Sequence, residues 1–199
     1  MKLETNSIKP RNESVLVSVL FKEDIDADGN YVGGDVQANK MNIEFYHGTV
    51  EGFGEKADND NQCPGLNNGD HIIFSQFAGC SVPTEDKFCK IIRGYDIIAI
   101  AKDVNMEKDS IKPTADRILI DVIEESSIDD GGFYNGGEHN PAEKQTQKGV
   151  ILELGPNVDS SQFQKGDTVF FDPYCGNMII DNTKMKLKTI NSFDVLFTI

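Results

Sequence analysis

The feature that most constrains the fold of this 199-residue chain is an internal repeat. Four short segments of the first half recur in the second half in the same order, at offsets between 97 and 103 residues. The pairs are IKPRNESVLV (8–17) with IKPTADRILI (111–120), GTVEGFG (48–54) with GVILELG (149–155), NGDHIIF (68–74) with KGDTVFF (165–171), and YDIIAI (95–100) with FDVLFT (193–198). A constant order with slowly drifting offsets indicates a tandem duplication with insertions and deletions in the loops.

The repeat predicts two domains and a short connection between them. We expect the first domain to span residues 1–101 and the second to span residues 111–199. Residues 102–110, KDVNMEKDS, are polar and short, which is typical of a linker.

Each copy is predicted to be all-β. Short runs of β-branched and apolar residues follow Gly-Asp turns, as in HIIF (71–74) and TVFF (168–171), and no segment shows a long 3.6-residue apolar period. Short strands separated by Gly, Asn and Asp turns favour a small irregular β-barrel in each copy.

Composition narrows the classes of partner. The net charge of −14 argues against a nucleic-acid-binding protein and against an anionic membrane surface, because both need clustered Lys and Arg. No apolar stretch approaches the length of a transmembrane helix, and the first residues lack the apolar core of a secretory signal. Four cysteines without a CxxC pair do not suggest a disulfide scaffold. We therefore predict a cytoplasmic protein without a membrane or nucleic-acid partner.

Two long polar segments interrupt the strand pattern, one in each copy. Residues 22–44 and 124–147 both fall between the first and second expected strands. Both are rich in Gly and charge, and each contains one small apolar group: Tyr31 and Val32 in the first, Phe133 and Tyr134 in the second. Unstructured loops of this length are usually functional or disordered, and the repetition indicates that the loop is a property of the fold.

The repeated pieces resemble the chaperonin-10 family, the GroES-type co-chaperonins. The similar pieces are I-K-P-x-x-(D/E)-x-(V/I)-L-(V/I), G-x-(V/I) after a long loop, G-D-x-(V/I)-x-F, and (F/Y)-D-(V/I)-(L/I), found in both copies and covering nearly the whole chain. The resemblance implies two tandem GroES-like irregular β-barrels, each with a long mobile loop. It also implies self-association into a ring or dome, through first and last strands.

The resemblance further implies a co-chaperonin that caps a chaperonin-60 ring in its ATP-bound state and closes a folding chamber around a client protein. It implies neither catalysis nor a cofactor. The docking tips would be Asn30, Tyr31 and Val32 in the first loop, and Phe133, Tyr134 and Asn135 in the second. Phe77 and Tyr174 would face the chamber. The connection Pro156–Lys165 is too short for the family's roof hairpin. A reduced roof resembles phage-encoded co-chaperonins. The expected location is therefore the cytoplasm of a bacterium or of a phage-infected host.

Calcium binding is the alternative function that the sequence defines most specifically. Residues 24–35, DIDADGNYVGGD, match EF-hand spacing, with candidate ligands at Asp24, Asp26, Asp28, Asn30 and Asp35. However, Asp replaces the usual bidentate Glu at the last position, no helical flanks are evident, and the second copy does not keep the spacing.

Two further alternatives have less support in the sequence. A structural β-barrel protein without a chaperonin partner would have little need of the same long loop twice. A zinc-dependent dehydrogenase would need a dinucleotide-binding domain and suitably spaced Cys and His, and the chain has neither. Small buried cysteines are the expected state of Cys80 and Cys89.

Overall fold

The computed structural model of the chain is all-β and consists of two compact units. It describes residues 2–20, 45–58, 63, 65–75, 77–101, 108–123, 146–181 and 186–199. Unit 1 comprises Met1–Arg117 and Gly155–Val158, and unit 2 comprises Ile118–Leu154 and Asp159–Ile199. Within the described residues the only helical elements are short 3-10 turns: η1 (Thr5–Ser7), η3 (Gly94–Asp96), η4 (Lys108–Ser110) and η5 (Ser192–Asp194).

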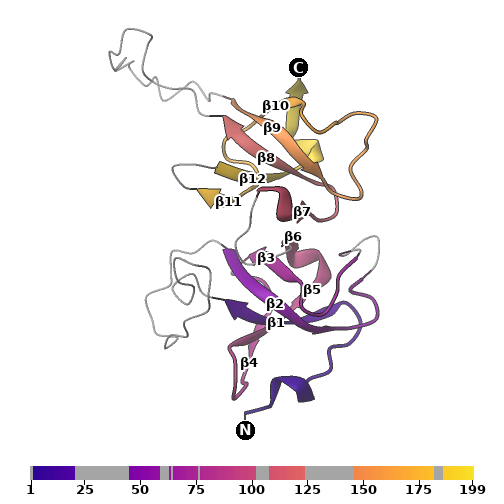
Figure 1. The fold of residues 1–199 in the computed structure, drawn as a ribbon, viewed down its shortest axis with the longest axis vertical. Helices are drawn as coiled ribbons and strands as arrows, with labels where there is room; N and C mark the ends of the chain where they lie inside the picture. Colours follow the sequence, from indigo (N-terminus) through magenta and orange to yellow (C-terminus); the bar gives the residue numbers. More distant parts are fainter. Residues whose placement is uncertain are drawn as a thin grey trace, which may run out of the picture. The chain divides into compact units, whose positions relative to one another are not determined.

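The first sheet has seven strands in the order β4-β5-β1-β2-β3-β6-β7 (Figure 1). Each of its pairings is antiparallel. The strands are β1 (Ser14–Leu20), β2 (Phe45–Phe53), β3 (His71–Ser75), β4 (Cys80–Val82), β5 (Cys89–Arg93), β6 (Ile97–Ala101) and β7 (Ile111–Pro113).

The second sheet has six strands in the order β11-β12-β8-β9-β10-β13. They are β8 (Arg117–Ile123), β9 (Gln147–Leu154), β10 (Thr168–Phe171), β11 (Asn177–Asp181), β12 (Lys186–Asn191) and β13 (Val195–Thr198). This order repeats the first six positions of the first sheet, strand for strand. The sequence prediction of an all-β duplication is confirmed, and among the described strands β7 alone has no counterpart in the second sheet.

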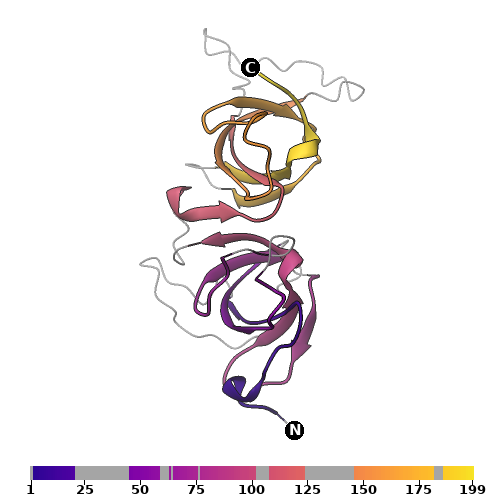
Figure 2. The same cartoon turned by 90° about the vertical axis from the view of Figure 1, so that its right-hand side faces the viewer.

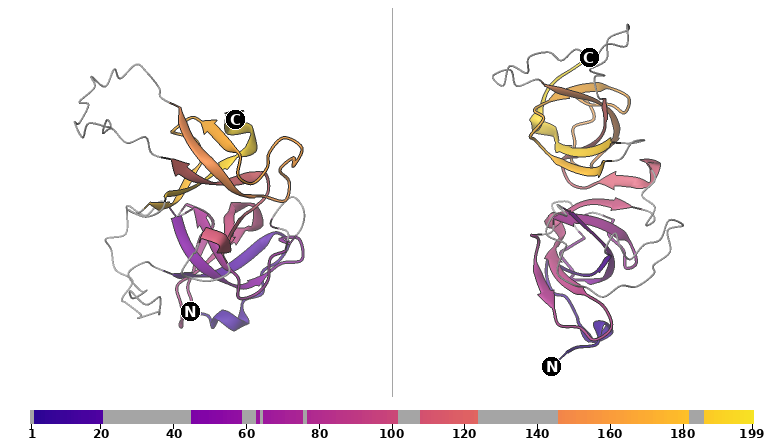
Figure 3. Two further views of the ribbon diagram at one scale, coloured as in Figure 1. Left: turned by 45° about the horizontal axis from the view of Figure 1, so that its top comes forward. Right: turned by 90° about the vertical axis from the view of Figure 1, so that its left-hand side faces the viewer.

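Both sheets curl into barrels, as Figures 2 and 3 show for each unit by itself. The curl has a shared local cause. The register of β1 on β2 shifts between Leu16 and Val17, and that of β8 on β9 shifts at the equivalent Leu119 and Ile120. A β-bulge adds a residue to one strand, which bends that strand and increases its twist. Two copies with the same bulge therefore close in the same way.

Close packing inside each barrel requires a glycine at one equivalent position. A Cβ on Gly48 would lie 2.3 Å from Val17 Cγ1, and a Cβ on Gly149 would lie 2.2 Å from Ile120 Cγ2. Both would also lie under 3.0 Å from a backbone oxygen of the neighbouring strand. These two glycines let the first and second strands approach closely.

Buried aliphatic and aromatic residues fill each barrel. In unit 1 the core cluster includes Val15, Val50, Ile72 and Phe74, and the β2–β3 connection adds Ala57, Cys63 and Leu66 to it. The core of unit 2 is made by fully buried residues of four strands, β8, β9, β10 and β12: Ile118, Ile120, Ile151, Val169, Phe171, Leu187 and Ile190. The β9–β10 connection, Pro156–Lys165, contains turns and no strand, as its length predicted.

The predicted linker ends in an ordered element. Residues 102–107 lie outside the described residues, but Lys108–Ser110 forms η4 and Ile111–Pro113 forms β7, which pairs with β6 of the first sheet. The start of the second sequence copy thus completes the sheet of unit 1. The domain limits 1–101, 102–110 and 111–199 stay predictions.

Candidate partner-binding surfaces

The two long polar segments join equivalent strands. The first lies between β1 and β2, where Leu20 pairs with His47, and the second lies between β8 and β9, where Ile123 pairs with Lys148. Because each segment connects the first antiparallel pair of its sheet, both leave the barrel at the same place in the fold. The predicted docking tips lie outside the described residues: Asn30, Tyr31, Val32, Phe133, Tyr134 and Asn135.

Phe77 and Tyr174 occupy the tips of equivalent turns and are strongly exposed. Phe77 is 86% exposed and Tyr174 is 84% exposed. The turn at Phe77 is closed by a hydrogen bond from Ala78 N–H to Ser75 O (2.9 Å), and the turn at Tyr174 by one from Cys175 N–H to Asp172 O (3.0 Å). The side chains of Ser75 and Asp172 accept hydrogen bonds from Phe77 N–H and Tyr174 N–H. The same pattern of hydrogen bonds thus accompanies an exposed aromatic ring in each unit.

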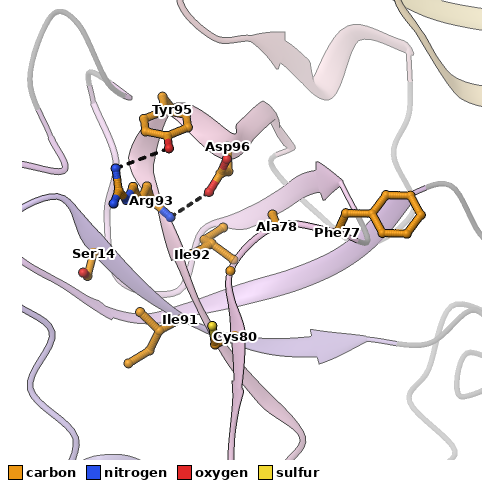
Figure 4. A pocket seen from close by; sticks show the side chains of 10 residues that line it. Ser14, Phe77, Ala78, Cys80, Ile91, Ile92, Arg93, Tyr95 and Asp96 are labelled. Atoms are coloured by element: carbon orange, nitrogen blue, oxygen red, sulfur yellow. Dashed lines mark hydrogen bonds between the residues drawn. The ribbon is translucent and has the colours of Figure 1, made fainter.

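An open groove of about 390 Å³ lies beside Phe77 in unit 1. Ala78, Cys80, Ile91 and Ile92 provide its apolar lining (Figure 4). At one end, Arg93 lies over the ring of Tyr95, with 5.7 Å between the guanidinium carbon and the ring centroid, and Arg93 N–H donates to Asp96 Oδ2 (3.0 Å). Figure 4 shows the Phe77 ring pointing away from this Arg–Tyr–Asp end.

A buried lysine is present at the same place in both barrels. Lys90 Nζ lies 6.0 Å from the ring centroid of Phe74, and Lys188 Nζ lies 5.3 Å from that of Phe171. Lys188 also donates to Pro173 O (2.7 Å), within the turn that carries Tyr174. Burial lowers the pKa of both ammonium groups, because the charged form loses hydration.

The outer edge of the first sheet is covered by β7. Ala99, Ile100 and Ala101 of β6 pair with Pro113, Lys112 and Ile111. Thr114 Oγ1 donates to the carbonyl oxygens of Ile97 and Ile98, and Arg117 Nη1 donates to Ile97 O (3.2 Å) and to Thr114 Oγ1 (2.8 Å). We call these two side chains the Thr114–Arg117 clamp. The Ile111 side chain is buried beside β6.

The equivalent edge of the second sheet carries exposed apolar side chains. Phe193 is 74% exposed, Leu196 58%, Phe197 50% and Ile199 81%. Phe197 stacks on Phe170 of β10 with 4.3 Å between ring centroids. We call Phe193, Leu196, Phe197 and Ile199 the C-terminal edge. The sequence analysis predicted only a strand at VLFT (195–198). It did not identify the C-terminal edge or the Thr114–Arg117 clamp.

The structure also bears on the metal and cysteine predictions. In the part of the chain that it describes, no three His, Cys, Asp or Glu side chains gather into a cluster that would hold a metal. The calcium candidates Asp24, Asp26, Asp28, Asn30 and Asp35 lie outside that part, so this alternative stays a prediction. Cys89 is buried as expected, but Cys80 is exposed, because it lies on the short strand β4 beside the groove. No helix of the described residues is long and apolar enough to cross a membrane.

Comparison with known proteins accounts for the duplication. The family model of the chaperonin 10 Kd subunit matches this chain twice in tandem, at residues 7–101 and 110–199. The chain belongs to the chaperonin-10 family. The two sheets, whose orders agree over six strands, therefore form two tandem GroES-like barrels.

The similar proteins cover either most of this chain or about a third of it. The 20 kDa chloroplastic chaperonin of Arabidopsis thaliana is 27% identical over 183 residues, which cover 86% of this chain and 67% of the relative. The co-chaperonin GroES of Thermodesulfovibrio yellowstonii is 37% identical over 70 residues, covering 35% of this chain and 74% of the relative. The co-chaperonin GroES of Borreliella afzelii is 34% identical over 67 residues, covering 34% of this chain and 71% of the relative. This chain is thus a chaperonin-10 protein with two repeats.

Proposed function

We propose that this chain is a co-chaperonin that caps a chaperonin-60 ring in an ATP-dependent manner and closes the chamber in which a client protein folds. The observation that carries the proposal is the tandem match to the chaperonin-10 model, together with the position of the two long polar connections. Both connections leave their barrels between equivalent strand pairs, so one chain presents two docking segments of the same origin.

The docking segments are expected to work through small apolar tips. A polar segment that becomes ordered on binding loses conformational entropy, which a few buried apolar side chains offset only in part. We assign that contact to Tyr31 and Val32 in the first copy and to Phe133 and Tyr134 in the second, flanked by Asn30 and Asn135. Weak single contacts are compatible with a stable cap, because several tips presented by one ring bind with much greater avidity than one tip.

The test is native mass spectrometry or co-sedimentation with a chaperonin-60 ring, with and without ATP. We expect a complex only with ATP, and we expect Tyr31→Ser, Val32→Gly, Phe133→Ser and Tyr134→Gly together to abolish it without changing the thermal unfolding of the barrels. The matched control places the same residue types at Gln37, Asn39, Glu143 and Gln145 of the same segments. Capping that survives the tip substitutions would refute the site, and a nucleotide-independent complex would refute the mechanism.

Phe77 and Tyr174 are proposed to contact the client rather than the chaperonin. Their support is the pair of equivalent turns that hold both rings in solvent and, in unit 1, the apolar groove beside Phe77. Phe77→Ser with Tyr174→Ser is expected to leave capping intact and to lower the yield of refolded client. An unchanged yield would remove this assignment. No catalytic group or cofactor is part of the proposal, and the bacterial or phage-infected cytoplasm stays a prediction.

A further inference from the structure

Each barrel buries one lysine at the same position of its sheet. Lys90 on β5 is 6% exposed, and Lys188 on β12 is 4% exposed. The two lysines are 98 residues apart, which is also the offset between the repeated segments 95–100 and 193–198 that follow them. A buried ammonium group loses its hydration, and an apolar side chain at the same place would avoid that loss. The lysine is thus unfavourable for the core, yet both copies have it.

The immediate neighbours of the two lysines differ, whereas the ring that each ammonium group contacts is the same. The neighbours are Cys89 and Ile91 in the first copy and Leu187 and Thr189 in the second. The rings are Phe74 and Phe171, both fully buried, at 6.0 Å from Lys90 Nζ and 5.3 Å from Lys188 Nζ. The face of an aromatic ring attracts a cation and partly replaces its lost hydration. The pair of lysine and phenylalanine is therefore a shared device of the two barrels.

In unit 2 the lysine is bonded to the turn that carries Tyr174. Lys188 Nζ donates to Pro173 O (2.7 Å). Two further hydrogen bonds form within the turn, from Cys175 N–H to Asp172 O (3.0 Å) and from Tyr174 N–H to Asp172 Oδ1 (2.8 Å). These two shape the turn, whereas the lysine bond joins it to β12 and the core.

Both turns also pack closely against the strand that carries the lysine. Gly79 and Gly176, which end the two turns, have φ values of +60° and +68°. A Cβ on either glycine would lie under 3.0 Å from a backbone oxygen, that of Ile91 or of Thr189. Ile91 and Thr189 directly follow the two lysines in the sequence. Each lysine therefore lies next to the point where its turn meets the barrel.

We propose that Lys188, and Lys90 at the equivalent position, are positioning residues that hold the turn of the exposed aromatic ring away from the barrel, ready for a client protein. An apolar ring in water gains free energy by covering itself with other apolar groups. A suitable surface is near in unit 1, where Ala78 and Ile91 line the groove beside Phe77. A turn fastened to the core cannot move to bury its ring. The inference deepens the proposed function and rests on it for the role of the client.

The test replaces both lysines by methionine, Lys90→Met with Lys188→Met, and in a second chain by arginine. Methionine fills a similar volume without charge, so both barrels should unfold at the same or a higher denaturant concentration. The amides of Ala78 and Cys175, which close the turns, should exchange about 10- to 100-fold faster, because a charge-assisted hydrogen bond is lost. Millisecond hydrogen exchange with mass spectrometry measures this change.

The arginine chain separates positioning from packing. Arginine keeps the charge and the hydrogen-bond donors, so Lys90→Arg with Lys188→Arg should restore slow exchange of the turns. A side chain needed only for packing would give the reverse order, with methionine closer to the wild type than the larger arginine. Lys165→Met is the matched control: it removes an exposed ion pair with Glu153 (2.6 Å) and should leave both turns unchanged.

The consequence for a client is measured separately. With ATP and chaperonin, the methionine chain should still cap, and its yield of refolded client should fall toward that of Phe77→Ser with Tyr174→Ser. Methionine variants with less stable barrels, turns that exchange as slowly as in the wild type, or an unchanged client yield would each overturn the inference. Because unfolding and exchange are measured without chaperonin, failure of the turn prediction and failure to cap are separate results.

Discussion

β6 and β13 hold the same position in two sheets of equal strand order, but their outer edges differ. β6 is covered by β7 and fastened by Thr114 and Arg117, while β13 presents Leu196, Phe197 and nearby Phe193 and Ile199 to solvent. The composition of each strand fits its surroundings: small alanines lie where a strand is already in place, and large apolar side chains lie where one is missing. The two copies thus have different edges: β7 covers that of β6, and no strand of the described residues covers that of β13.

The prediction with the largest expected effect asks whether the two barrels are stabilised independently. Gly149→Ala should lower the unfolding free energy of unit 2, which contains β13, by about 3 kcal/mol, because the new Cβ meets Ile120 and a backbone oxygen. β6 and β7 belong to unit 1 and should keep their amide protection, measured by hydrogen exchange with mass spectrometry. Gly48→Ala should lower the unfolding free energy of unit 1 and leave the amide protection of unit 2 unchanged.

The glycine prediction has a control in the same strand as Gly48. A Cβ on Gly52 would meet only the ring of Pro10, at 3.7 Å, so Gly52→Ala should leave both units nearly unchanged. Equal loss of protection in both units after Gly149→Ala would show that the two edges are not independently supported.

The second test breaks the covered edge alone. Arg117→Ala removes hydrogen bonds to Ile97 O and Thr114 Oγ1 from a partly buried site, which should cost about 1–3 kcal/mol. Faster exchange of the amides of β6 and β7, with unchanged exchange at β13, is the expected result. Arg93→Ala is the control, because that guanidinium lies over Tyr95 at an exposed site and should matter by about 0.5 kcal/mol. Protection of β6 that survives Arg117→Ala would mean that the clamp does not hold β7.

The prediction with the smallest expected effect concerns the β2–β3 and β9–β10 connections. Burial raises the pKa of Cys63, in the β2–β3 connection, to about 12, whereas the equivalent β9–β10 connection has no cysteine. Because the folded pKa is higher than the unfolded value near 9, this contribution to stability is complete below pH 9 and is lost as pH rises toward 12. Unit 1 should lose about 1.4 kcal/mol between pH 8 and pH 10 from this group.

Chemical denaturation at pH 8, 9 and 10 measures the alkaline loss in each unit. Cys63→Ala should start from a lower stability, because it leaves a small cavity, but should not show this alkaline loss. An alkaline loss in the wild-type unit 1 no larger than that of the Cys63→Ala chain would contradict the burial of the thiol.

Much of the fold could be predicted because the repeat is visible in local patterns. The apolar runs at His71–Phe74 and Thr168–Phe171 form strands, and Gly-Asp turns precede both. The exposed turns of Phe77 and Tyr174 were singled out on resemblance alone. The C-terminal edge was missed because VLFT (195–198) has the composition of any buried strand, and exposure of a strand depends on which neighbour pairs with it.

The amino-acid sequence by itself determined the duplication, the all-β class, the strands of the repeated segments and the membership in the chaperonin-10 family. These follow from local periodicity, turn residues and motifs, which do not depend on distant contacts. Only the tertiary structure decided that Ile111–Pro113 completes the sheet of unit 1 while the same tripeptide at Ile8–Pro10 remains outside any strand. The physical reason is that edge pairing is non-local: identical residues are buried or exposed according to the strand beside them.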